Sequence, residues 1–72
     1  MTNRRHANLT ARHQHAGAAE LQARADRLAA KVAATRSEKR RAEWIEEIRV
    51  IGELQDAAVA DALADIRNAL AA

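Results

Sequence analysis

The chain has 72 residues, a formal net charge of +2, no cysteine and no proline. This length allows one domain, and the lack of cysteine excludes disulfide bonds and thiolate metal sites. No apolar run is long enough for a signal peptide or a membrane span, so we expect an intracellular protein, in the cytoplasm or in a virus particle assembled there.

Residues 1–15 are predicted to form a basic flexible arm. Leu9 is the only large aliphatic side chain among them, apart from Met1. The segment carries three histidines and three arginines, and arginine side chains are suited to contacts with phosphate groups: Arg4, Arg5 and Arg12. On a helix His13 and His15 would lie about 200° apart, and no carboxylate is close in sequence, so no metal site is predicted.

The first helix is predicted over about 18–35. Apolar residues recur there at steps of three and four, as on one face of an α-helix: Ala18, Leu21, Ala25, Leu28 and Val32. The face is narrow and rich in alanine. Such small side chains let a neighbouring helix approach closely.

The second helix is predicted over about 38–70. Its apolar face consists of seven residues: Ile45, Ile48, Gly52, Val59, Leu63, Ile66 and Leu70. Several of these positions are spaced by eleven residues, which corresponds to about 3.67 residues per turn. This spacing favours helices that pack nearly straight and is not typical of a leucine zipper.

A turn at about 35–38 is predicted to separate these two helices. Their apolar faces would lie on nearly opposite sides of one continuous helix, and a break removes this conflict. Thr35 and Glu38 have the spacing of a capping box, and Ser37 is a second candidate cap. We therefore expect an all-α fold in which residues 16–72 form an antiparallel helical hairpin. Two hairpins would pack as a dimeric four-helix bundle, or the hairpin would join a larger helical assembly; the alternative is one long coiled-coil helix.

The stretch from Trp44 to Leu54 has apolar groups over more of its circumference than a helix that packs on one side. So short a chain has little mass to cover such a segment, and we expect a second copy or another protein to cover it. The predicted protein interface comprises eight residues of the second helix: Trp44, Ile48, Ile51, Leu54, Val59, Leu63, Ile66 and Leu70.

Charge is distributed unevenly along the chain. Residues 1–36 have a net charge of +5, and residues 37–72 have a net charge of −3. A second basic cluster, also a candidate for phosphate contacts, lies at the predicted turn: Lys39, Arg40 and Arg41. The glutamates of the second helix predict a solvated face, since a thin hairpin offers no pocket in which catalytic pKa values would be tuned.

These observations predict a non-enzymatic small helical assembly or adaptor protein that acts through protein–protein contacts of its second helix. We expect a homo-oligomer, a protein partner or both, with no cofactor, no small-molecule substrate and no membrane. The alternative is a nucleic-acid-binding accessory protein that uses the arginine-rich N-terminal arm. A weaker alternative is a small structural component of a phage or another large particle.

Overall fold

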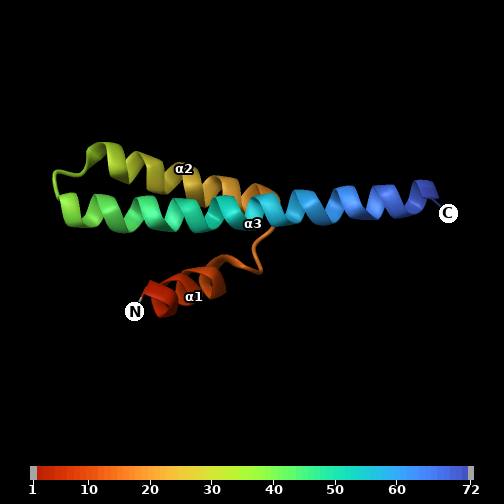
Figure 1. Ribbon diagram of the computed structural model, residues 1–72. Helices are drawn as coiled ribbons and strands as arrows, with labels where there is room; N and C mark the ends of the chain where they lie inside the picture. Colours follow the sequence, from red (N-terminus) through yellow and green to blue (C-terminus); the bar gives the residue numbers. More distant parts are fainter. Residues whose placement is uncertain (1, 72) are drawn as a thin grey trace.

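The computed structural model describes residues 2–71 and is all-helical over that range (Figure 1). Its helices are α1 (Thr2–His13), α2 (Ala18–Ala34) and α3 (Glu38–Ala71). The all-α class predicted from composition is confirmed, and three helices take the place of the single long helix considered as an alternative. Among the described residues, no helix is both long enough and apolar enough to cross a membrane.

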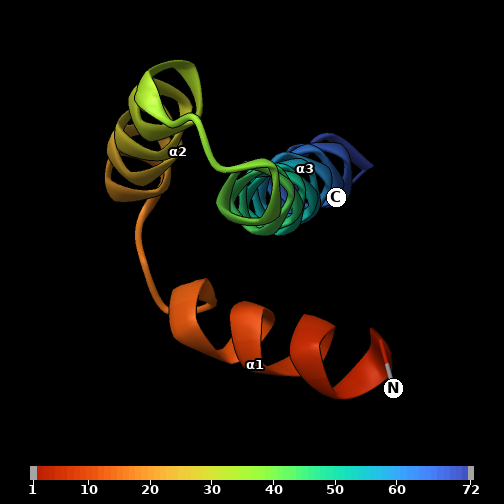
Figure 2. The same cartoon turned by 90° about the vertical axis from the view of Figure 1, so that its left-hand side faces the viewer.

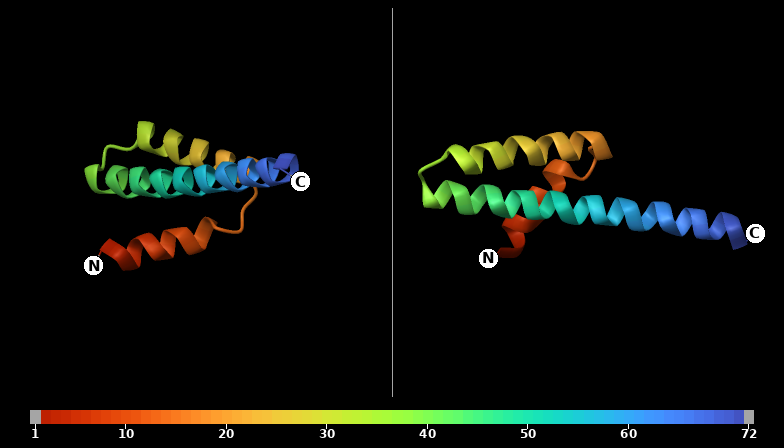
Figure 3. Two further views of the ribbon diagram at one scale, coloured as in Figure 1. Left: turned by 45° about the vertical axis from the view of Figure 1, so that its right-hand side comes forward. Right: turned by 90° about the horizontal axis from the view of Figure 1, so that it is seen from above.

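A short connection of residues 35–37 reverses the chain between α2 and α3, which lie side by side in opposite directions (Figures 1 and 3). Ser37 caps α3, because its Oγ accepts a hydrogen bond of 3.3 Å from the backbone N–H of Arg40. Thr35 ends α2: its N–H bonds the carbonyl of Lys31 at 3.0 Å, and its hydroxyl accepts from the N–H of Ser37. Polar caps at both helix ends therefore fix the position of the reversal.

The apolar core lies between α2 and α3. Leu21 and Leu28 of α2 and Ile51 of α3 form its buried centre. Partly buried apolar side chains pack around this centre: Ala16, Ala25, Trp44, Ile48 and Leu54. The alanines of α2 keep the two helices close, so a few large side chains are enough to exclude water from Ile51.

Helix α1 occupies most of the segment for which the sequence predicts a flexible arm, and it crosses α3 on a side away from α2 (Figure 2). Leu9 of α1 and Val50 of α3 are both buried. At 100° per residue, Val50 lies between Glu46 and Glu47 on α3, and both glutamates pair with side chains of α1. Tertiary contact with this acidic side of α3 explains why the basic segment is helical.

The segment from Trp44 to Leu54, which is apolar over much of its circumference, is covered in part by the chain's own helices. Helix α2 covers the side of Ile51, and α1 packs on the side of Val50. Val50 and Ile51 are buried within a single chain. These two residues are covered within the chain because α1 supplies a layer where the sequence predicts a flexible arm, and the expectation that a second copy or another protein contacts this segment stays a prediction.

Replacement of Gly52 by alanine is expected to stabilise the protein. Gly52 lies inside α3 without a positive φ, and a Cβ atom added there would meet nothing within 4 Å. Glycine in a helix interior costs about 1 kcal/mol relative to alanine, so the variant should gain about that much in free energy of unfolding. Urea denaturation followed by circular dichroism measures the gain. A loss of stability would mean that another chain packs against Gly52.

Candidate functional site

The eight residues predicted as a protein interface divide into two groups in the structure. Ile51 lies in the core, and Trp44, Ile48 and Leu54 pack around it. The remaining four are exposed on the C-terminal half of α3, with exposed fractions of 59% for Val59, 55% for Leu63, 56% for Ile66 and 83% for Leu70. The first group stabilises the fold of the single chain, and the second is the candidate site.

Val59, Leu63, Ile66 and Leu70 form one continuous line, called here the outer stripe. Their spacing of four, three and four residues keeps them within about 60° of one another around the helix axis. Every residue from Asp56 to Ala71 is exposed. Figures 1 and 3 show the reason: this half of α3 projects beyond the start of α2. The outer stripe is thus a row of large apolar side chains on an uncovered helix.

The molecule is more extended and more exposed than a compact protein of its size. Its radius of gyration is 14.9 Å, whereas about 11 Å is expected for a compact domain of this length. Its accessible surface is 5647 Å² for a mass of 7.9 kDa, whereas about 4,400 Å² is expected for a folded monomer of that mass. The projecting half of α3 accounts for this shape and leaves surface available for association.

An apolar groove of about 440 Å³ lies at the base of the projecting helix. Its walls come from the first turns of α2 and from α3: Ala18, Leu21, Gln22, Gln55, Ala58, Val59 and Ala62. Gln55 Nε2 donates a hydrogen bond of 3.1 Å to Gln22 Oε1 and ties the two helices together there. Val59 belongs both to the groove and to the outer stripe, so the two features form one surface.

The basic residues predicted to contact phosphate lie in two places. Three are engaged within the chain: Arg5 pairs with Glu46 at 3.1 Å, Arg12 pairs with Glu47 at 3.3 Å, and Arg41 Nη2 donates to the carbonyl of Thr35. The other three are Arg4 on α1 and Lys39 and Arg40 in the first turn of α3, and all six residues are exposed. The structure does not gather the six into one patch.

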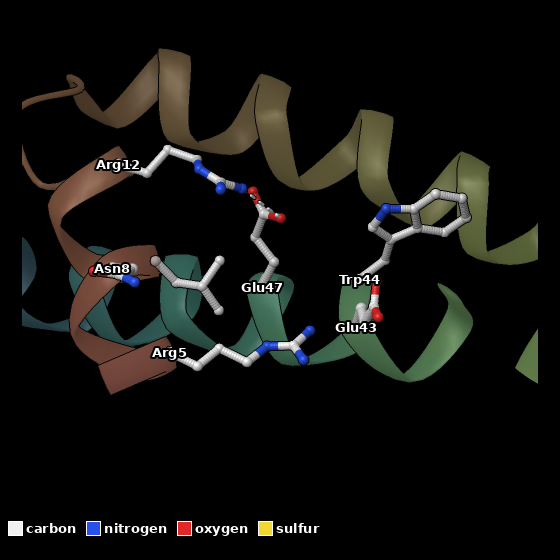
Figure 4. Close-up of a pocket in the computed structure, with 7 residues that line it drawn as sticks. Arg5, Asn8, Arg12, Glu43, Trp44 and Glu47 are labelled. Atoms are coloured by element: carbon white, nitrogen blue, oxygen red, sulfur yellow. Dashed lines mark hydrogen bonds and ion pairs between the residues drawn. The ribbon is translucent and has the colours of Figure 1, made fainter. Parts of the chain in front are cut away.

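A polar groove of about 410 Å³ separates α1 from the first half of α3. Figure 4 shows Arg12 and Glu47 pointing toward each other across it, while Trp44 lies apart, against α2. Arg5 and Arg12 both contact glutamates of α3, and these ion pairs hold the two helices together across the groove. Its contacts are those of a helix–helix interface.

A part-buried polar network that sequence reasoning missed joins all three helices. His13 of α1 is buried, and its Nε2 lies 2.7 Å from Oε2 of Glu47. Arg24 of α2 donates from Nη1 to the other ring nitrogen, Nδ1, at 3.1 Å. Because arginine has only donors and a carboxylate only acceptors, this arrangement fits a neutral imidazole with its proton on Nε2. The sequence signal was weak, a single Leu9 four residues before His13.

Comparisons of the chain with protein-family models, with curated proteins and with solved structures find no match.

Replacement of Trp44 by alanine is expected to destabilise the single chain. Trp44 packs on the core, and Nζ of Lys31 lies 5.8 Å from the centre of its ring. Because Trp44 is only partly buried, we expect a loss of about 2 kcal/mol, below the 3–5 kcal/mol of a fully buried tryptophan. Urea denaturation measures the loss. Lys31→Met is the matched control and should cost about 1 kcal/mol or less, since it removes the cation only.

Proposed function

We propose that this protein is a non-enzymatic helical assembly or adaptor protein that binds another protein chain through the outer stripe of α3. One observation carries the proposal: four large apolar side chains, each more than half exposed, lie in line on a helix that projects from the rest of the fold. Isolated exposed apolar residues are ordinary, but a continuous apolar patch commonly marks an interaction site.

The size of the outer stripe supports a binding role. Full burial of a large aliphatic side chain is worth roughly 1.5–3 kcal/mol, so covering the exposed parts of these four is worth about 4–8 kcal/mol. This free energy is comparable with the lower estimates of what association costs in translational and rotational freedom. A partner that adds its own apolar surface would double the area removed from water.

The helical state of the projecting segment also supports a partner. Helices shorter than about 12–15 residues are marginal in water unless an apolar face packs on something. The segment from Asp56 to Ala71 has 16 residues, just above this limit, and all of them are exposed. A partner on the outer stripe would supply the packing that keeps this segment helical.

The alternative reading as a nucleic-acid-binding accessory protein has weaker support. Arg5 and Arg12 are paired with glutamates of the same chain. A guanidinium group that already contacts a carboxylate must exchange that contact for a phosphate, so it adds less affinity than a solvated one. A place in a phage or another particle would use the outer stripe in the same way as an adaptor.

The proposal is tested by affinity purification of the tagged chain from its source organism. We expect the double variant Leu63→Gln/Ile66→Gln to lose the proteins that the wild-type chain retains, including untagged copies of itself. The control variant Ala57→Gln/Ala64→Gln places the same side chains on the opposite side of the helix and should retain them. If the stripe variant retains the same proteins in the same yield as the control, the proposed function is wrong.

A further inference from the structure

We propose that the outer stripe binds the outer stripe of a second copy of this chain. The two helices pack antiparallel, and the two-fold axis that relates them crosses the seam at the level between Ala64 and Asp65. The inference rests on the proposed function, in which the stripe binds protein, and it names the partner. Two-fold dimers use the same patch on both subunits, so the patch must be complementary to itself. The spacing of the stripe and the residues beside it meet this requirement, and the exposed surface is large enough for an interface.

The spacing of the stripe matches itself when reversed. Val59 and Ile66 are seven residues apart, and so are Leu63 and Leu70. In an antiparallel pair with this axis, Val59 lies opposite Leu70 of the second copy, and Leu63 lies opposite Ile66 of the second copy. Every layer then pairs a β-branched side chain with a leucine, and no layer contains a polar residue. Seven-residue spacing is the repeat that lets two helices keep a seam in contact.

The positions beside the stripe allow close approach. Between Val59 and Leu70, three of the four flanking residues are alanines, Ala60, Ala62 and Ala69, and the fourth is Arg67. At 100° per residue, Asp61 and Asp65 lie on the far side of the helix from the stripe or at its edge. Solvent therefore separates the aspartates of the two copies, and no like charges meet along the seam.

One chain leaves enough surface exposed for a dimer interface. The accessible surface of 5647 Å² exceeds the value expected for a compact monomer of this mass by about 1,200 Å². A stable protein–protein interface of standard size buries about 800 Å² on each partner. The excess is larger than this area, so the chain exposes enough surface for an interface of standard size.

The groove at the base of the projecting helix adds a seat for the end of the second copy. In the antiparallel arrangement, Leu70 of the second copy lies beside Val59, which lines the groove together with Leu21 and Ala62. The groove is open and apolar, and leucine is an apolar side chain of suitable length. Leu70 has the most exposed of the four stripe side chains, and this contact would cover it at both ends of the dimer.

Disulfide cross-linking tests the arrangement, since the chain has no cysteine of its own. Ala62→Cys and Ala69→Cys flank the stripe and leave it intact. We expect oxidation of an equal mixture of the two single variants to join most of the mixed pairs. In this arrangement Ala62 and Ala69 of the second copy lie only about 3 Å apart along the axis. Each variant alone should give little covalent dimer, because like positions lie about 7.5 Å apart along the axis for Ala62 and about 13.5 Å apart for Ala69, beyond the roughly 7 Å limit for Cα atoms in a disulfide.

The results separate the possible arrangements. Efficient self-cross-linking of Ala62→Cys, without mixed pairs, would place the two-fold axis at the level of residue 62 and overturn the inference. A monomeric mass for the wild-type chain in light scattering at 100 μM, about a hundredfold above a dissociation constant of roughly 1 μM expected for a modest dimer, would overturn it as well. In that case, loss of partners by Leu63→Gln/Ile66→Gln would still support the proposed function with a different protein.

Discussion

Replacement of Ile51 by alanine is expected to leave the chain largely unfolded at 37 °C. Ile51 is 0% exposed and lies at the centre of a core with only two other buried side chains, Leu21 and Leu28. Large-to-alanine changes in a core cost about 2–5 kcal/mol, because they remove apolar contacts and leave a cavity. Small domains have total stabilities at the lower end of roughly 5–15 kcal/mol. Thermal unfolding followed by circular dichroism measures the effect.

Ile45→Ala is the matched control for this prediction. Ile45 is the same residue type on the same helix, but it is 42% exposed. The alanine variant should cost less than about 1.5 kcal/mol, because a partly exposed side chain loses less burial and leaves no closed cavity. Equal destabilisation by the two substitutions would show that the core does not lie between α2 and α3.

Replacement of Glu47 by glutamine is expected to detach α1 from α3. Glu47 accepts from His13 at 2.7 Å and pairs with Arg12 at 3.3 Å, and its side chain is 13% exposed. The amide offers one acceptor oxygen in place of two and carries no charge, so its NH2 group faces one of the two donors, and the bond that remains to the other is weaker. Leaving a buried polar group unsatisfied costs about 1–3 kcal/mol, more where a charged partner is involved. Amide hydrogen exchange of residues 2–13 should become much faster, with α2 little changed.

Glu53→Gln provides the comparison, because it removes a glutamate–histidine pair of the same chemistry at the surface. The carboxylate of Glu53 lies 2.9 Å from Nε2 of His6, and both side chains are about half exposed. Exposed pairs of this kind contribute about 0–1 kcal/mol. If Glu53→Gln accelerates exchange in α1 as much as Glu47→Gln, then burial of the His13 network is not what holds α1 in place.

The all-helical class was predictable because it depends on composition and on local periodicity. Alanine, leucine, arginine and glutamate have high helix propensity, and the apolar residues of both predicted helices recur at helical spacing. The break between the helices is also visible in the sequence, because Ser37 directly precedes the second helix and its hydroxyl can cap that helix. These features need no information about tertiary contacts.

Helix α1 was not predictable in the same way. It has one large buried apolar residue, Leu9, and its other contacts are polar, with Arg24 of α2 and with Glu46, Glu47 and Glu53 of α3. Those glutamates lie more than thirty residues away in sequence, so the spacing within α1 does not reveal them. The net charges of opposite sign in the two halves of the chain indicated an attraction without indicating where it acts.

The sequence pattern also could not show which residues of the predicted interface are buried and which are exposed. Trp44, Ile51, Leu63 and Leu70 are all apolar residues of one helix. Which of them are buried depends on where α2 begins along α3, and this position is set by packing in three dimensions. The first turn of α2 lies near Ala62, as the groove there shows, and residues beyond that point receive no cover from α2.

The unbroken length of α3 has a mechanical consequence. With 34 residues and a rise of about 1.5 Å per residue, it forms a rod about 51 Å long. Whatever binds its far end is held at a fixed distance and at a fixed angle from α1 and α2. Insertion of one residue near Asp56 would rotate the outer stripe by about 100°, whereas insertion of seven would lengthen the rod by about 10 Å and rotate the stripe by only about 20°. Related chains of different length should therefore differ there in steps that preserve the direction in which the stripe faces.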